Sequence, residues 1–248
     1  MTKTQPTILK SNQPQQASFP RRQSPKRQPS KVLPSREIEE SLLAQGYFSI
    51  VGIDEAGRGA FAGPLVAAGV ILSEEEIVGI DDSKRLTAKK RLVLAEKIKQ
   101  SCRGWYVSII EPDIINKLGI QRASYQAYQE IVNKINPSPD HILIDYYRIP
   151  KVQLPQIAMK FGDQISLSIA AASIIAKVER DILMIERDQL TQYRDYGFAL
   201  HKGYGTKLHR EIIRQKGISD QHRIKYCRKC VDINPQEKFN FTNKEKNV

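Results

Sequence analysis

The sequence predicts an α/β domain built around a mixed β-sheet. Apolar runs of strand length come first along the chain, and helical and strand-like segments then alternate. The hydrophobic fraction of 40% in 248 residues suits a soluble globular protein with a substantial core. Strands followed by alternating helix and strand therefore give a mixed sheet flanked by helices.

Five runs have the length and composition of strands. The apolar stretch that begins at Tyr47 predicts a buried strand, and it ends at two adjacent carboxylates, Asp54 and Glu55. The second run follows a glycine-containing turn and can return antiparallel to the first, the third alternates in polarity, and the fourth reads H-I-L-I-D. The five runs cover residues 48–54, 65–72, 105–110, 141–145 and 157–161.

The remaining regular segments have helical spacing. Thr87 is a suitable N-cap for the first long helix. In the longest helix, the run of small residues at 170–173 allows close packing against a sheet. The predicted helices are a short one that starts near residue 35, followed by residues 87–101, 111–135, 166–192 and 208–215.

The first 36 residues differ from the rest in composition. They contain eight Lys and Arg, no Asp or Glu, six of the thirteen prolines and one aromatic residue. Such a segment cannot bury enough apolar surface to fold. We expect a disordered basic Pro/Gln-rich tail at residues 1–36, a folded domain at 37–230 and a flexible polar tail at 231–248.

The positive charge is concentrated in the N-terminal tail. The formal net charge is +12, but residues 37–248 hold 31 Lys and Arg against 27 Asp and Glu. The excess could favour a polyanion such as nucleic acid through counterion release. A purely solubilising tail explains it equally well.

Several classes of protein are not expected. No apolar run reaches the roughly 18 residues needed to span a bilayer, and the N-terminus has no apolar core of a secretory signal. Three cysteines in a chain of this length do not suggest a disulfide framework, so a cytoplasmic location is expected. Cys227 and Cys230 form a C-x₂-C without a second pair, and reduced surface thiols are favoured over a zinc site.

Four acidic residues stand at the ends of predicted elements: Asp54, Glu55, Asp145 and Asp163. Carboxylates at strand ends along one sheet edge can converge, and open α/β sheets bind ligands at such edges. Three or four hard oxygen ligands suit Mg²⁺ or Mn²⁺, and two such ions can activate water and stabilise a leaving oxygen. The alternative for an isolated strand-end Asp, and for Asp163 before the long helix, is a turn or cap role.

Three further segments could contact a phosphate or a sugar. Gly57-Arg58-Gly59 lets backbone approach a ligand closely, although a plain hairpin turn is the default for a bare tripeptide. Lys84 offers a cation ahead of a helix, where a capped helix start is the alternative. Tyr204 belongs to a segment that mixes aromatics, cations and glycines and suits stacking, or else is a structural tyrosine in a surface loop.

Other ionisable residues are weaker candidates for a functional site. Glu179 and Asp181 lie inside the long helix beside Lys177 and Arg180, where solvated pairing at i,i+3 or i,i+4 accounts for them. None of the four histidines falls in a recognisable nucleophile motif, so a Ser or Cys nucleophile with a histidine base is not expected.

Taken together, these segments resemble ribonuclease HII. The matching pieces occur in family order over about residues 50–225, and the ordered set is specific although no single piece is. They are I-D-E-A-G-R-G-A-F-A-G-P (53–64), D-D-S-K-R-L (81–86), L-I-D (143–145), G-D (162–163) with S-L-S-I-A-A-A-S-I-I-A-K-V-E-R-D (166–181), Y-G-F-A-L-H-K-G-Y-G-T-K-L-H (196–209) and the late His222-Arg223.

The resemblance implies a fold and an activity. The fold is an RNase H-like mixed sheet flanked by helices, with a small helical C-terminal part, and residues 37–230 are the catalytic domain. The activity is hydrolysis of RNA in RNA–DNA hybrids, including single ribonucleotides embedded in duplex DNA, with a role in removing them. The cut falls 5′ to the ribonucleotide and leaves 3′-hydroxyl and 5′-phosphate ends. A monomer that needs no membrane is expected.

The resemblance also assigns residues. The catalytic, metal-binding residues, which would hold Mn²⁺ or Mg²⁺ with two ions during catalysis, are Asp54, Glu55, Asp145 and Asp163. The substrate contacts are Gly57, Arg58 and Gly59 for the ribose 2′-hydroxyl at the RNA–DNA junction, Tyr204 for the adjoining deoxyribose, and Lys84 for a phosphate. The 2′-hydroxyl is what distinguishes RNA from DNA at one position.

Some positions depart from the family pattern. Ala60 replaces the usual proline, Tyr146 the usual glycine after the third acid, and Ile165 a common lysine. The ending after His222-Arg223 is also different, with I-K-Y-C at residues 224–227. Because the four acids remain, activity is expected, with Tyr146 and Ile165 affecting substrate affinity or metal preference.

Two alternatives remain. The sibling ribonuclease HIII shares the acidic motif but carries a folded N-terminal domain of roughly 80 residues, for which the Pro/Gln-rich tail is unsuited. A non-catalytic nucleic-acid-binding protein would use the basic tail and the segment around Tyr204. It would have no need for four acids near a phosphate.

Overall fold

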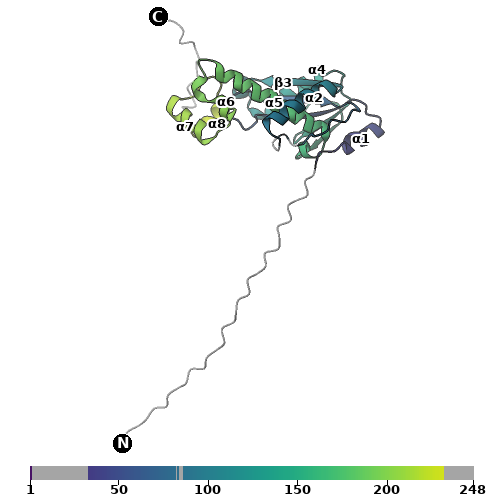
Figure 1. The fold of residues 1–248 in the computed structure, drawn as a ribbon, viewed down its shortest axis with the longest axis horizontal. Helices are drawn as coiled ribbons and strands as arrows, with labels where there is room; N and C mark the ends of the chain where they lie inside the picture. Colours follow the sequence, from purple (N-terminus) through teal and green to yellow (C-terminus); the bar gives the residue numbers. More distant parts are fainter. Residues whose placement is uncertain (2–32, 82, 84–85, 232–248) are drawn as a thin grey trace. The chain divides into compact units, whose positions relative to one another are not determined.

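Five strands form one mixed sheet. The computed structural model describes residues 1, 33–81, 83 and 86–231. The strands are β1 (Ile50–Ala56), β2 (Leu65–Ile71), β3 (Gly104–Ile110), β4 (His141–Asp145) and β5 (Gln156–Met159). Their order is β3-β2-β1-β4-β5. Figure 1 shows the sheet among its helices. Pairs β1–β2 and β2–β3 are antiparallel, whereas β1–β4 and β4–β5 are parallel.

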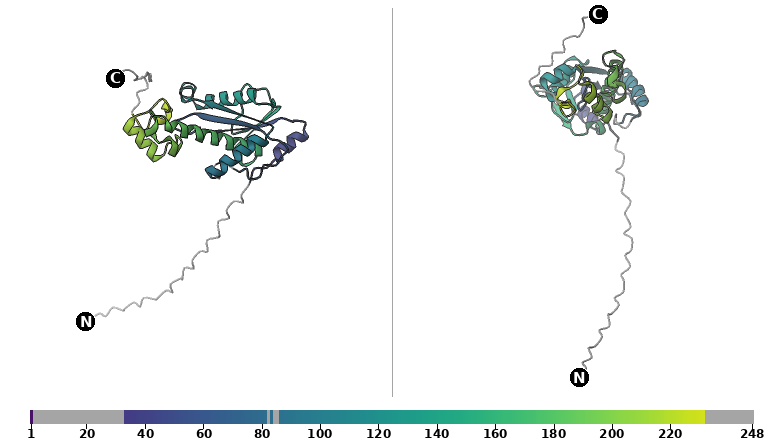
Figure 2. Two further views of the ribbon diagram at one scale, coloured as in Figure 1. Left: turned by 45° about the horizontal axis from the view of Figure 1, so that its top comes forward. Right: turned by 90° about the vertical axis from the view of Figure 1, so that its left-hand side faces the viewer.

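Helices cover both faces of this sheet (Figure 2). The longer helices are α1 (Glu37–Ala44), α2 (Ala88–Ser101), α3 (Pro112–Leu118), α4 (Ile120–Lys134), α5 (Leu167–Gln189) and α7 (Lys207–Lys216). The short ones are η1 (Gly162–Gln164), η2 (Arg194–Tyr196), α6 (Phe198–His201) and α8 (Ile224–Cys227). Helix α5 with α2 packs on one face, and α4 packs on the other. Burial on both faces explains why β2 is apolar along its whole length.

Glycine and alanine allow α5 to lie close to β1. A Cβ atom on Gly52 would come within 2.3 Å of the Ser168 backbone carbon, so only glycine fits there. The run at residues 170–173 is buried against the sheet, as its small side chains predicted. This close contact fixes α5 beneath β1, the strand that carries Asp54 and Glu55.

The predicted elements are present, with two differences. The helical region predicted at 111–135 is divided in two at Gly119, whose φ of 77° is left-handed and ends α3. The short helices α6 and α8 have too few residues to show a helical period in the sequence. Thr87 caps α2 as predicted, and its side chain accepts a hydrogen bond from Lys90 N at 3.3 Å.

The helices after α5 gather at one end of the described residues 33–231, close to the end of α5 (Figure 1). A β-bridge between Ala62 and His222 ties them to the turn that follows β1. Cys227, which was expected at the surface, is buried there, because α8 turns its thiol toward the Phe61 carbonyl at 3.8 Å.

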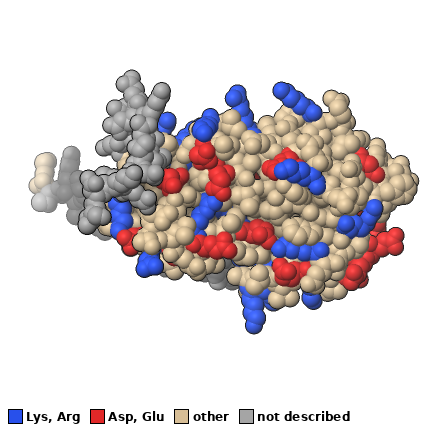
Figure 3. All heavy atoms as spheres, turned by 90° about the horizontal axis from the view of Figure 1, so that it is seen from above, with Lys and Arg blue, Asp and Glu red and all other residues tan. Residues whose placement is uncertain are grey.

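The face of the molecule drawn in Figure 3 is mixed in charge. Basic and acidic side chains alternate over the face drawn in Figure 3. Among the residues described, no helix is sufficiently long and apolar to cross a bilayer.

Candidate active site

Three of the four predicted carboxylates meet at one edge of the sheet. Asp54 and Glu55 lie near the end of β1, and Asp145 ends β4. Since β1 and β4 are parallel neighbours, their carboxyl ends lie at the same edge. The three side chains line one hollow of about 290 Å³. Asp54 is only 6% exposed.

The carboxylates are held by specific donors. Tyr128, on α4, donates its hydroxyl to Glu55 Oε2. Ser173, on α5, and the Glu55 backbone N–H hydrogen-bond to Asp54. These donors come from both helical layers, so the two faces of the sheet together fix the acidic pair.

The electrostatics of the hollow favour a bound cation. Burial, and then the charges of Glu55 and Asp145, raise the pKa of Asp54 well above its usual value. Burial likewise raises the pKa of Glu55, although the Tyr128 hydrogen bond and Arg58 oppose this. Arg58 Nη1 lies 3.6 Å from Glu55 Oε1 and offsets part of the negative charge. A divalent cation would offset the rest.

Asp163 lies beside this group without lining the hollow. Gly162 donates its N–H to Asp145 Oδ1 at 2.7 Å, so the next residue, Asp163, is near the Asp145 carboxylate. Asp163 is 2% exposed in η1, and the cap of α5 is instead Ser166, which accepts from Ile169 N. Within residues 33–81, 83 and 86–231, no three His, Cys, Asp or Glu side chains form a preassembled metal site.

The hollow continues onto the turn after β1, where the glycines at 57 and 59 differ in what they require. Gly57 has a φ of +90°, and an added Cβ would meet Arg180 Nε at 1.9 Å, so the fold itself demands glycine. Gly59 is exposed, and an added Cβ would meet nothing within 4 Å. Protein packing therefore leaves its identity unexplained, whereas the close approach of a ligand would explain it.

Two buried arginines hold this turn from below. Arg180 and Arg223 are both 0% exposed. Arg223 donates to the carbonyls of Gly57 at 2.6 Å, Arg58 at 3.1 Å and Gly63 at 2.9 and 3.1 Å. Arg180 donates to the carbonyls of Ala62, Pro64 and Lys202 at 2.9–3.1 Å. With carbonyls bound from inside, the turn keeps a fixed backbone conformation at the hollow.

The family is decided by sequence comparison. A family model described as ribonuclease HII matches residues 51–229. The ribonuclease HII of Caldicellulosiruptor bescii is 41% identical over 79% of this chain and 95% of that protein. The ribonuclease HII of Acholeplasma laidlawii is 45% identical over 75% and 91%.

The chain belongs to the ribonuclease HII family. It is therefore an endoribonuclease of the type that cleaves RNA in RNA–DNA hybrids and at embedded ribonucleotides.

Solved structures agree with the RNase H-like fold. The ribonuclease H2 of Pyrococcus horikoshii superposes with a TM-score of 0.62 and 26% identity over 73% of this chain and 96% of that chain. A PCNA:RNase HII complex from Archaeoglobus fulgidus gives 0.61 and 30% identity over 71% and 93%. A Bst-RNase HIII in complex with Mn²⁺ gives 0.59 at 20% identity over 74% and 69% and shows the fold alone.

The predicted ribonuclease HII substrate residues differ in how they are placed relative to the acids. The 57–59 turn and Tyr204 line the same hollow as the three acids. The Arg58 side chain turns toward α4, where Nη1 donates to Ser124 Oγ at 2.9 Å and Nη2 to Gln121 Oε1. Lys84 lies outside the described residues.

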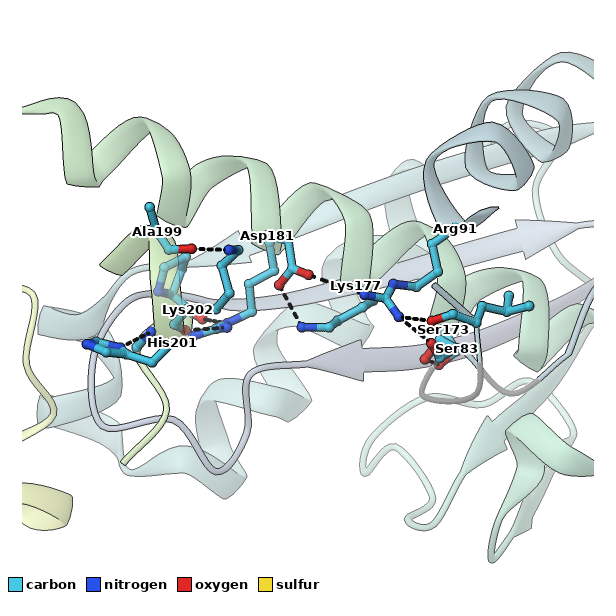
Figure 4. Close-up of polar contacts among 12 residues, drawn as sticks. Ser83, Arg91, Ser173, Lys177, Asp181, Ala199, His201 and Lys202 are labelled. Atoms are coloured by element: carbon cyan, nitrogen blue, oxygen red, sulfur yellow. Dashed lines mark hydrogen bonds and ion pairs between the residues drawn. The ribbon is translucent and has the colours of Figure 1, made fainter. Parts of the chain in front are cut away.

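Lys177 is a site residue that the sequence did not mark, whereas Ser83 belongs to the segment expected to offer donors to a phosphate. Both line the hollow. Lys177 lies 5.4 Å from the Tyr204 ring centroid, and its Nζ bonds Asp181 Oδ1 at 2.6 Å. Arg91 also approaches Asp181, at 3.8 Å, and donates to the Ser83 carbonyl at 2.8 Å (Figure 4). The predicted i,i+4 pair of Lys177 and Asp181 is present, but it is half-buried at the site rather than solvated.

Tyr204 is supported by a buried histidine pair. His209 Nδ1 bonds the Tyr204 carbonyl at 3.0 Å, and its Nε2 lies 3.1 Å from His222 Nε2. Both rings are 0% exposed. Since Ser219 N donates to His222 Nδ1, His222 donates from Nε2 and His209 donates from Nδ1. The ribonuclease HII motif that ends in His209 and resumes at His222 thus holds the backbone of the site tyrosine.

Proposed function

We propose that this chain cuts the phosphodiester bond on the 5′ side of a ribonucleotide in duplex DNA or in the RNA strand of a hybrid, leaving 3′-hydroxyl and 5′-phosphate ends. The observation that supports this most is the shared hollow. It places the acids Asp54 and Glu55 next to a backbone turn, Gly57 to Gly59, that a ribose could approach closely. Such a protein would serve in removing ribonucleotides from DNA.

The donor set suits a divalent metal. Asp54, Glu55 and Asp145 would hold Mg²⁺ or Mn²⁺, with Asp163 completing a second position. Mg²⁺ usually takes one or two carboxylates together with waters and substrate phosphate oxygens, and the carboxylates of this hollow can supply that number. The ions would supply an activated water and charge stabilisation at the leaving oxygen. A related Bst-RNase HIII has been solved with Mn²⁺.

The protein residues then have separate tasks. The backbone of residues 57–59 reads the 2′-hydroxyl, and the Tyr204 ring stacks on the deoxyribose that follows the ribonucleotide. Lys177 and Lys84 neutralise phosphates, and the Ser173 hydroxyl and the Tyr128 hydroxyl orient Asp54 and Glu55. Substrate choice and catalysis therefore lie within a few residues of one strand end.

The remaining expectations concern the rest of the chain and its setting. We place the reaction in the cytoplasm, on DNA containing ribonucleotides and on longer hybrids, with the protein acting as a monomer. The basic residues 1–36 add sequence-independent affinity for the duplex. Deleting them should weaken binding at low salt and leave junction specificity unchanged.

The test uses a duplex with one ribonucleotide, Mn²⁺ or Mg²⁺, and the variant Asp54→Asn. The variant should lose cleavage but keep or raise its unfolding temperature, because ionisation of the buried Asp54 is penalised. Asp113→Asn on the exposed face of α3 is the matched control and should cleave normally. Full activity of Asp54→Asn would refute the metal-site assignment. Tight binding without cleavage by the unmodified protein would favour a binding protein instead.

A further inference from the structure

Two tyrosines directly after Asp145 adopt an arrangement that protein packing does not explain. Tyr146 has a φ of 70°, in the left-handed region that favours glycine. Its ring and that of Tyr147 meet with centroids 4.4 Å apart, yet the residues are 49% and 42% exposed. A strained backbone that presents two aromatic rings to solvent indicates that the rings have a partner outside the fold.

The position of the pair is fixed by the sheet. Tyr146 donates its N–H to the Met159 carbonyl at 2.8 Å, which continues the pairing of β4 with β5 by one residue. Tyr147 donates its N–H to the Asp145 carbonyl at 3.0 Å. The rings therefore lie immediately beyond the acid that ends β4.

The pair borders the acidic centre on a different side from Tyr204. A second hollow, of about 260 Å³, is lined by the two tyrosines together with Tyr128 and three residues of the first hollow: Glu55, Arg58 and Asp145. Tyr204 lines the first of these two hollows and not the second. The shared acidic residues thus separate the tyrosine pair from Tyr204.

Cations and a further aromatic ring surround the pair. Arg58 lies 5.5 Å from the Tyr147 ring centroid, and Lys160 lies 5.8 Å from that of Tyr146. Phe161, the next residue after Lys160, is 66% exposed with a left-handed φ of 58°. Exposed aromatic rings mixed with cations suit single nucleotides, because every base offers a π-face and every linkage a negative charge.

We propose that Tyr146 and Tyr147 form a stacking platform for the base on the 5′ side of the phosphate that is cleaved. The inference rests on the proposed function, in which the turn at 57–59 engages the ribose and Tyr204 engages the sugar on its 3′ side. The strand then continues past the acids in the 5′ direction, where the second hollow and the tyrosine pair lie. The platform would grip the upstream nucleotide.

The test is a double-mutant cycle that combines one change in the protein with one change in the substrate. One duplex carries a single ribonucleotide preceded by a normal nucleotide, and a second carries an abasic tetrahydrofuran site at that upstream position. Cleavage of both by the full-length protein and by the double variant Tyr146→Gly/Tyr147→Ala gives four values of kcat/KM. Aromatic stacking on one base corresponds to a change of about 5- to 150-fold. The abasic site should cost the unmodified protein a factor in this range and the variant no further loss.

Control variants distinguish the loss of the tyrosine rings from the release of the strained backbone conformation by glycine. Lys151 also has a left-handed φ, 64°, in the same connection between β4 and β5, so Lys151→Gly gains the same backbone freedom without losing a ring. It should behave as the unmodified protein on both duplexes. Tyr146→Gly alone should unfold no lower than the unmodified protein, because glycine adopts this φ freely.

The outcomes distinguish this inference from the proposed function. If the unmodified protein cleaves both duplexes at the same rate, or if the losses from the variant and the abasic site multiply, the platform is refuted while the endonuclease assignment stands. If the unmodified protein cleaves neither duplex, the proposed function fails and the platform fails with it.

Discussion

The turn at residues 57–64 should depend on the guanidinium fork of Arg223. Its four hydrogen bonds reach three carbonyls, those of Gly57, Arg58 and Gly63, from a side chain with no exposed surface. Arg223→Lys keeps the charge but replaces the planar fork by a single ammonium group. That group can satisfy one of these acceptors well and leaves the others without a charged donor.

The number of hydrogen bonds lost sets the size of the fall in stability. Loss of two hydrogen bonds from a charged donor, at about 1.5 kcal/mol each, lowers the free energy of unfolding by about 3 kcal/mol. For a folded part of this length that corresponds to a fall in unfolding temperature of about 6–12 °C. A loss of this size is smaller than the stability of a typical domain, so we expect the variant to be folded at 25 °C, where its activity can be compared. A loosened turn should lower kcat/KM for a single-ribonucleotide duplex by about 10²-fold, since small misplacements of a substrate contact are costly.

Thermal unfolding and single-ribonucleotide cleavage are measured side by side for Arg223→Lys and for Arg214→Lys. Arg214 pairs with Glu211 on the exposed face of α7, so its replacement should change neither quantity. An Arg223→Lys protein that unfolds within about 1 °C of the unmodified protein and cleaves normally would show that the fork does not hold the turn.

The remaining predictions concern approach, charge and pH. Gly59→Ala should leave the unfolding temperature unchanged, because an added Cβ meets no protein atom within 4 Å. It should abolish cleavage, because the added methyl group blocks the approach of the ribose. Normal cleavage by this variant would show that the ribose does not approach Gly59 closely. Lys177→Met should weaken duplex binding and reduce the slope of log affinity against log salt by about 1, and an unchanged slope would exclude a phosphate contact. Burial lowers the pKa of His209 to about 4 and of His222 to about 3. Because the unfolded state takes up these protons below about pH 6.5, stability should be complete above that pH and fall by about 2 kcal/mol per histidine between pH 7 and pH 5. Denaturant unfolding at the two pH values measures this, and removing both histidines should flatten the profile.

The sequence predicted what depends on local pattern. The strands, the long helix and the Thr87 cap follow from periodicity and from residue types at element ends. The expectation that strand-end acids converge needed only the rule that parallel strands end at one edge, and β1 beside β4 brings Asp54 and Asp145 to one hollow. Their role as metal ligands rests on the proposal above.

Long-range contacts could not be predicted in this way. Arg180 occupies a helix position beside charged neighbours, which suggests a solvated face, yet it is fully buried against carbonyls more than a hundred residues earlier in the chain. Arg223 is similar. Nothing in the local sequence shows that these guanidinium groups hold the turn at residues 57–64. Only the packing of α5 and of the C-terminal helices against that turn shows it.

The backbone at Tyr146 illustrates a second limit. A tyrosine directly after a strand gives no sign of a left-handed φ, because side-chain identity argues against that conformation. The family pattern, which has glycine at this position, marks Tyr146 as unusual. Its left-handed φ and its exposed ring are seen in the structure alone, and they suggest that the ring has a partner outside the fold.

The position and chemistry of the cut on a duplex with one ribonucleotide test the central claim most directly. With Mg²⁺ or Mn²⁺, the protein should make one cut, 5′ to the ribonucleotide, and leave 3′-hydroxyl and 5′-phosphate ends. An all-DNA duplex of the same sequence should remain intact. A cut on the 3′ side of the ribonucleotide, a cyclic phosphate product, or cleavage of the all-DNA duplex would contradict an acidic centre guided by the Gly57–Gly59 turn.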